Sequence, residues 1–180
     1  MATTLRCLTE GLFSKAKKKA KDFLRAAKNT LKSIKKSIVK DKKKYTTKKT
    51  ASTFKPGNLL TFRYNALDQT KKFDKNPLIV CLGSPRDNSR HTLGLNLHWL
   101  PENQRVLLAS LVIEMLEKNN GVLVYNDIKP LIQKFKGSPI LRRYAIRRIS
   151  NQVISMPQDM YLASATITYP EWHYGDKESV

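Results

Sequence analysis

The chain of 180 residues is long enough for one domain with a substantial core, and 41% of its residues are hydrophobic. Its 34 lysines and arginines outnumber 14 acidic residues and leave a formal net charge of +20, which predicts a polyanionic partner, nucleic acid before anionic membrane. Two cysteines in separate segments argue against a disulfide framework, and no apolar run reaches the roughly 18–20 residues of a spanning helix. We therefore expect a protein that is neither secreted nor anchored by a membrane span.

The positive charge is concentrated at the N-terminal end. Residues 1–50 contain seventeen lysines and arginines and three acids, a net charge of +14, which leaves +6 of the total for residues 51–180. One end of the chain is thus a polycation, and the remainder is a mildly basic globular part.

An amphipathic helix is predicted within the basic segment. Apolar residues recur there at spacings of three and four, in a stripe about seven turns long. The stripe contains Phe13, Ala16, Ala20, Phe23, Ala27, Leu31, Ile34 and Ile38. It is narrow and rich in alanine, so it suits docking on a protein surface better than burial in lipid.

Basic side chains occupy the other faces of this helix. They have two interpretations. They form an ordinary solvated face, or they form a face on which an anion relieves the repulsion between the positive charges. We favour the second because the charge density is high, and we expect these residues to contact DNA phosphates. The candidates are Lys15, Lys17, Lys18, Lys19, Lys21, Arg25, Lys28, Lys32, Lys35 and Lys36.

The segment 40–57 has no periodicity and is predicted to be an extended basic linker that ends in a turn at Pro56-Gly57. Three strands follow in an antiparallel meander. They cover residues 59–64, 77–82 and 92–100. The second is continuously apolar, which is typical of a strand buried on both faces. The third alternates leucines with more polar residues, places Trp99 on its inward face and ends before Pro101, which lacks an N–H.

Helices are predicted in the next part of the chain. Residues 102–118 have a wide apolar face, and Asn119-Asn-Gly121 ends this helix with left-handed backbone. Asn126 or Asp127 is expected to cap a second helix that runs through Phe135, with Pro130 in its first turn. A third helix is predicted to begin at Ser138-Pro139. Its inward residues would be Ile140, Leu141, Tyr144 and Ala145.

Two strands, over residues 153–156 and 160–168, close the predicted fold. The fold class is α+β: a small antiparallel or mixed sheet with two to three helices, preceded by a long basic amphipathic N-terminal helix and linker. The predicted division is a basic helical arm and linker over residues 1–56, a globular domain over 57–168 and an acidic tail over 169–180.

The sequence contains no pattern typical of a catalytic or metal centre. His91, His98 and His173 have no cysteine or acid at ligand spacing, and the seven glycines are scattered, so neither zinc nor a phosphate loop is predicted. The strands carry almost no acids, whereas a nuclease needs at least two clustered carboxylates. We predict a non-enzymatic protein with no cofactor, no metal and no catalytic residues.

Some residues within the predicted strands allow two interpretations each. His98 and Asn96 are interpreted as structural hydrogen-bonding residues rather than as a ligand and a catalyst. Trp99, Phe62 and Tyr64 could stack bases, but their alternation with leucines favours a role in the core.

Four arginines near the C-terminal end are further candidates for phosphate contacts. They are Arg142, Arg143, Arg147 and Arg148. Guanidinium groups bind phosphate in bidentate fashion, yet salt bridges between subunits or solubility explain the cluster equally well. Both interpretations stay open at this level.

The globular part resembles a family of small virion proteins of large contractile-tailed phages, the DNA end protector proteins. An ordered series of segments, within roughly residues 57–168, carries the resemblance. It consists of Thr61-Phe-Arg-Tyr64, Phe73-Asp-Lys-Asn-Pro-Leu-Ile79, Leu93-Gly-Leu-Asn-Leu-His-Trp-Leu-Pro101, Arg143-Tyr144 and Ile154-Ser-Met-Pro-Gln-Asp159. The long lysine-rich arm and the acidic tail depart from the family pattern.

The resemblance implies a non-enzymatic virion protein at the end of the packaged genome, near the portal or neck, that shields this end from exonucleases. We expect it to bind double-stranded DNA without sequence specificity, to associate with other virion proteins in multiple copies, and to be present in the host cytoplasm during assembly. One alternative is an architectural neck, tail or baseplate adaptor whose basic arm docks on neighbouring virion proteins. Another is a membrane-surface protein that uses the same helix.

Overall fold

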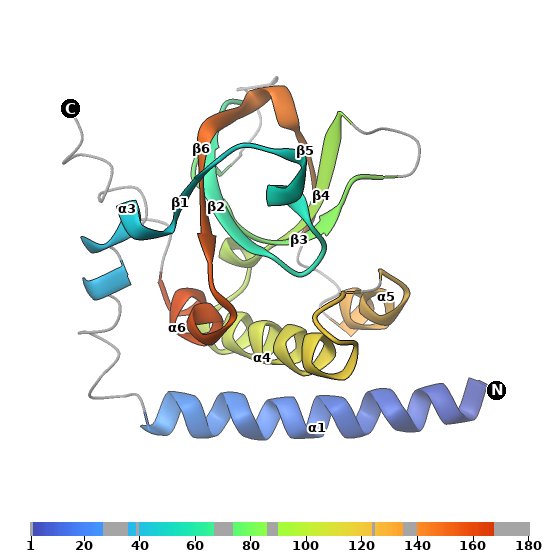
Figure 1. The fold of residues 1–180 in the computed structure, drawn as a ribbon. Helices are drawn as coiled ribbons and strands as arrows, with labels where there is room; N and C mark the ends of the chain where they lie inside the picture. Colours follow the sequence, from blue (N-terminus) through green and yellow to red (C-terminus); the bar gives the residue numbers. More distant parts are fainter. Residues whose placement is uncertain are drawn as a thin grey trace.

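The computed structural model of this chain describes residues 2–26, 36–38, 40–66, 74–85, 90–123, 125–134 and 140–167. Within them, six strands form one sheet in the order β1-β6-β2-β3-β4-β5, and every neighbouring pair is antiparallel (Figure 1). The strands are β1 (Thr46–Lys48), β2 (Leu59–Tyr64), β3 (Leu78–Gly83), β4 (His91–Asn96), β5 (Leu141–Ala145) and β6 (Ile149–Met156). Helices lie against one side of this sheet, so the predicted α+β class is confirmed.

The central meander follows directly from the sequence pattern. β2, β3 and β4 are hydrogen-bonded neighbours, with Leu59 opposite Val80 and Ile79 opposite Asn96. Every residue of β3 is buried, as its continuous apolar run predicts. The antiparallel meander is confirmed.

Alternation along the strands divides the core into two clusters. One face of the sheet, which includes Leu59, Val80 and Leu95, packs with the helices. The other face carries residues such as Leu60 and Ile79 in a second, smaller cluster, around which the sheet curves (Figure 1). Because both faces are covered, the apolar residues of β2 and β3 are removed from water, which is the main source of stability of the sheet.

Helix α4 (Glu102–Lys118) has the predicted bounds, and its end is confirmed in detail. Asn120 and Gly121 have φ values of 51° and 81°, and the Gly121 N–H donates to the Leu116 carbonyl at 2.7 Å. All residues from Leu108 to Leu116 are buried, because α4 lies between the sheet and helix α1 (Ala2–Ala26) (Figure 1). A helix covered on both sides is apolar around most of its circumference.

The predicted second helix exists as α5 (Tyr125–Lys134), but it begins before Asn126. Pro130 therefore lies inside the helix and not in its first turn. The predicted end at Phe135 lies outside the described residues.

The third predicted strand ends four residues earlier than the sequence pattern indicates. β4 stops at Asn96 and is followed by the 3-10 turn η2 (Leu97–Trp99). The Asn96 side chain accepts a hydrogen bond from the His98 N–H at 3.0 Å, and this cap turns the backbone out of the strand. Trp99 consequently lies half-buried at the margin of the core and not on the inward face of a strand.

The predicted third helix is wrong, because Leu141–Ala145 forms strand β5. The spacing of its apolar residues fits one helical turn, but five residues do not distinguish a helix from a strand. β4 leaves a row of backbone N–H and C=O groups that need partners, and β5 supplies them, with Thr92 opposite Tyr144.

The closing segment also differs from its prediction. β6 contains the predicted strand 153–156 and begins earlier, after the 3-10 turn η3 (Ile146–Arg148). The predicted strand 160–168 is wrong: the chain forms η4 (Gln158–Met160) and α6 (Tyr161–Ala165), which packs on α4. The buried hydroxyl of Tyr161 accepts from the Leu59 N–H at 3.1 Å and donates to the Gly57 carbonyl at 2.8 Å, which attaches α6 to the start of β2.

Part of the segment predicted as a linker has regular structure. It contains α3 (Lys42–Tyr45), β1, which extends the sheet beside β6, and the 3-10 turn η1 (Ala51–Phe54). The predicted turn at Pro56-Gly57 is present, and Gly57 has a φ of 96°. A Cβ at this position would lie 2.7 Å from Leu116 Cδ2, so both the backbone angle and the close approach to α4 require glycine.

Candidate nucleic-acid interface

Helix α1 is held against α4 by small residues. Ala16 and Ala20 are 0% and 4% exposed and belong to the main core cluster. Their small side chains allow the two helices to approach closely, and the buried Ser110 hydroxyl donates to the Ala16 carbonyl at 3.1 Å. These contacts fix which side of α1 faces the protein.

Two of the predicted DNA-contacting lysines are directed to acidic residues of α4. Lys15 Nζ lies 3.1 Å from Glu114 Oε2, and Lys19 Nζ lies 3.3 Å from Glu114 Oε1. Lys19 also lies 3.5 Å from Oε1 of Glu117. The sequence pattern did not predict these ion pairs, because they join residues about 95 positions apart.

The carboxylate of Glu114 is buried although its partners are accessible. Its side chain is 4% exposed, whereas the side chains of Lys15 and Lys19 are 73% and 39% exposed. Burial by itself raises the pKa of Glu114, but the hydrogen bonds and charges of both lysines outweigh it, so the pKa lies below its ordinary value. The group is therefore ionised at neutral pH and depends on the two lysines.

The solvent side of α1 presents an exposed cationic face, which we define as Lys17, Lys18, Lys21 and Arg25. At 1.5 Å of rise per residue this face is about 12 Å long. Because all four residues are exposed, their charges are accessible to a large polyanion. This is the best-defined candidate surface for phosphate contacts.

Of the remaining candidates in the basic segment, Lys36 is exposed. Lys28, Lys32 and Lys35 lie outside the described residues.

The four candidate arginines do not form one patch. Arg142 lies on the same face of β5 as Tyr144, and its guanidinium is 4.5 Å from the centre of the Trp99 ring, a cation–π arrangement. Arg143 is exposed and belongs to the opposite face of β5. Arg147, which is exposed, and Arg148, which is half-buried, lie in η3.

The aromatic residues form a core contact and not a stacking platform. Phe62 and Tyr64 both meet Tyr144 edge to face, with ring centroids 5.5 and 5.1 Å from it. Phe62 is 4% exposed, and Trp99 belongs to the margin of the other core cluster. The interpretation of Phe62 as a core residue is confirmed.

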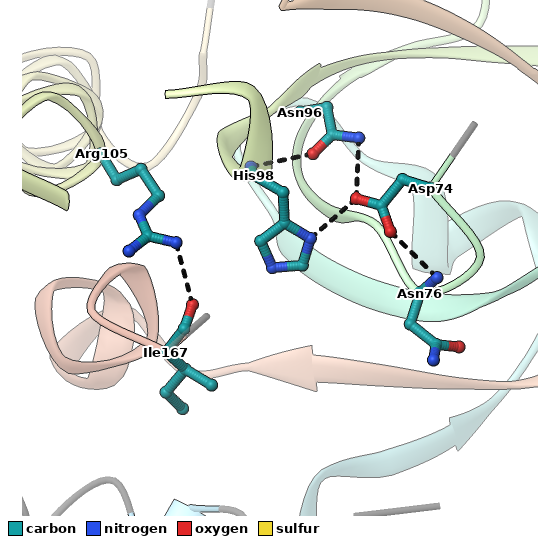
Figure 2. A network of polar contacts seen from close by, with 6 residues as sticks. All are labelled: Asp74, Asn76, Asn96, His98, Arg105 and Ile167. Atoms are coloured by element: carbon teal, nitrogen blue, oxygen red, sulfur yellow. Dashed lines mark hydrogen bonds and ion pairs between the residues drawn. The ribbon is translucent and has the colours of Figure 1, made fainter. Parts of the chain in front are cut away.

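His98 and Asn96 are structural, as predicted, and their shared partner is Asp74 (Figure 2). Asp74 Oδ2 accepts from His98 Nδ1 at 2.7 Å and from the Asn96 side chain at 3.1 Å, and its Oδ1 accepts from the Asn76 N–H at 3.1 Å. We call this group the Asp74 network. It joins the segment before β3 to the end of β4, and burial followed by the charge of Asp74 raises the pKa of Tyr144 beside it.

Sequence analysis missed Asp74, because it lies in a predicted loop 24 residues from His98. The available signal was its place directly before a fully buried strand, where an acid that caps its own backbone is common.

Figure 2 also shows the buried Arg105, whose guanidinium donates to the Ile167 carbonyl at 3.2 Å and secures the end of α6.

The described residues include no group of three or more histidine, cysteine, aspartate or glutamate side chains that could hold a metal ion. Among the described helices, none combines the length and hydropathy needed to cross a membrane.

The fold and the site together define an α+β protein that carries a cationic helix on its surface. The chain belongs to the family of the phage T4 terminal DNA protecting protein, whose model matches residues 7–136. Among curated proteins and solved structures, no match was found. The family resemblance predicted from the sequence is thereby confirmed.

The extent of the match corrects one part of that prediction. The match begins at residue 7, so all the lysines of the arm, which the sequence comparison places outside the family pattern, lie inside it together with most of α1 and all of α4. The match ends before β5, so all four candidate arginines lie beyond it. The comparison therefore gives more support to the arm than to the arginines as a family feature.

Proposed function

We propose that this protein binds the phosphates of double-stranded DNA without sequence specificity, and protects or anchors the packaged genome end in a virion, near the portal or neck. The observation that carries this proposal is the exposed cationic face of α1, held in a fixed orientation by α4 in a member of a DNA protecting family. The family description supports a role in shielding DNA and not in processing it, so the proposed role is non-enzymatic.

The binding chemistry is the neutralisation of phosphates. Each lysine or arginine that contacts a phosphate releases a counterion condensed on the duplex, and this release supplies most of the free energy of sequence-independent binding. Lysine ammonium groups contact the DNA backbone and do not distinguish base edges, so little sequence preference is expected.

The arginines of β5 and η3 are proposed as a second, weaker contact. Arg143 and Arg147 are exposed and suit this role best. Arg142 is engaged with Trp99, which makes it the least suitable of the four.

End protection is tested by comparing duplex ends with closed circles of the same sequence. We expect linear DNA to be protected from a processive exonuclease and to bind more tightly than the closed circle at equal nucleotide concentration. Equal affinity for both, with no protection, would reduce the function to general DNA packaging. No binding at low salt would contradict the proposal.

The alternative is an architectural adaptor in the neck, tail or baseplate, in which residues 1–50 dock on other virion proteins. Its support is that Ala16 and Ala20 already make a protein–protein type of contact within this chain. Deleting residues 1–50 distinguishes the two functions: loss of virion association with unchanged DNA binding of the remaining chain supports the adaptor. A membrane-surface role has less support, because these alanines of the apolar stripe face α4 and not solvent.

A further inference from the structure

We infer that Glu114 is a positioning residue that divides the lysines of α1 into two sets with different tasks. Lys15 and Lys19 form the docking set, which holds α1 on α4. Lys17, Lys18, Lys21 and Arg25 form the exposed cationic face, which contacts phosphates. The inference deepens the proposed function and rests on it, because it names the side chains of the basic segment that the DNA meets.

At 100° per residue, the four members of the exposed cationic face fall within an arc of roughly 100°. Lys18 and Arg25 lie opposite Ala16 and Ala20, and Lys17 lies at the edge of the arc nearest to these alanines. Lys15 and Lys19 are four residues apart and lie on one flank, from which both reach the same carboxylate. One acid on α4 thus contacts two cations and leaves the others exposed.

Separating the ion pairs costs the acid more than the lysines. The ammonium groups of Lys15 and Lys19 are accessible and would be rehydrated or bound by a phosphate if they left Glu114. The carboxylate lies against α1, where its side chain is 4% exposed while the lysines cover it, so it would recover less hydration than they would. Leaving its charge unpaired there is unfavourable, and this favours retention of the lysines when DNA is present.

The contact with α4 also fixes the rotation of α1. The hydrogen bond from Ser110 to the Ala16 carbonyl and the two ion pairs lie one turn apart along α4, and they hold the helix at two points. A rotation of α1 that brought Lys15 toward DNA would break both. The phosphate-contacting set is therefore defined by the docking and not by the number of lysines in the segment.

Two double variants test this division, because each removes two lysines spaced four residues apart on the same helix. K17Q/K21Q should flatten the slope of log K against log salt concentration by about two contacts, roughly 1.8 at 0.9 per contact. K15Q/K19Q carries the same change in charge but should leave this slope nearly unchanged. Its melting temperature should fall, because Glu114 is left unpaired.

A third variant separates docking from DNA binding. Adding E114Q to K15Q/K19Q removes the unpaired charge and should recover most of the lost melting temperature. E117Q provides the matched acid control: the Glu117 side chain is 53% exposed and pairs with Lys19, so the melting temperature of this variant should stay close to that of the unmodified protein.

The outcomes separate this inference from the proposed function. If K15Q/K19Q flattens the salt slope as much as K17Q/K21Q, or if E114Q fails to recover the melting temperature, the division is wrong even though DNA binding stands. If the unmodified chain does not bind DNA, the proposed function fails. The melting temperatures then still decide whether Glu114 pairs with Lys15 and Lys19.

Discussion

At the scale of single residues, the Asp74 network shows how a motif can resemble a catalytic group and yet serve the fold. A histidine whose Nδ1 donates to a carboxylate is the geometry of a general base held by an acid. Here the side chains of His98 and Asp74 are only 5% and 8% exposed, and Asp74 also accepts from Asn96 and from the Asn76 backbone. The carboxylate therefore accepts hydrogen bonds from donors in two segments and holds these segments together.

Replacing Asp74 with Asn should destabilise the protein by about 1–3 kcal/mol, because one buried donor would lose its acceptor. The measurement is the free energy of unfolding in urea. The control is D159N, which makes the same change at an exposed acid and should stay within about 0.5 kcal/mol of the unmodified protein. A similar loss in both variants would show that the network contributes nothing specific.

At the scale of elements, the packing of α1 on α4 depends on one titrating group. The pKa of Glu114 in the folded protein lies below its ordinary value of 4.5, because two lysines stabilise the ionised form. A group of this kind contributes stability that is complete above its unfolded pKa and is lost as the pH falls through its folded pKa.

The expected result is a pH-dependent difference between the unmodified protein and E114Q. At neutral pH the unmodified protein should be more stable by about 1–2 kcal/mol, at the low end of the range for hydrogen bonds to a charged group because the lysine partners are partly exposed. As the pH falls below 4.5 the two free energies of unfolding should converge. A difference that stays constant with pH would mean that Glu114 does not act through its charge.

At the scale of the whole molecule, the chain is organised as α1, α4 and the curved sheet, one above the other (Figure 1). The division into an arm over residues 1–56 and a domain over 57–168 remains a prediction. Both core clusters draw most of their residues from the second part, whereas Ala16, Ala20, Ile38 and Phe54 come from the first.

Limited proteolysis at lysines within residues 40–55 should release a C-terminal fragment that unfolds cooperatively. Its urea midpoint should be lower than that of the full chain, because Ser110 and Glu114 on α4 lose their contacts with α1 and become exposed to water. Circular dichroism during urea unfolding measures this. A fragment with no cooperative transition would place the arm within the folding unit.

Local chemistry by itself determined the central meander and helix α4. The apolar run of β3 and the left-handed end at Asn120 and Gly121 act within a few residues, so the sequence is sufficient to predict them. The family resemblance likewise rests on local segments. The prediction of a basic arm rests on the charge of residues 1–50 alone.

Only the tertiary structure decided β5, α6 and the separation of the lysines. Five residues from Leu141 fit either a helix or a strand, and the unsatisfied edge of β4 selected the strand. Lys15 and Lys17 are chemically identical in the sequence, and they differ because Glu114, about 95 residues away, meets only one side of α1. A contact between distant segments leaves no periodicity in either of them, so no local pattern could have predicted which lysines pair with Glu114.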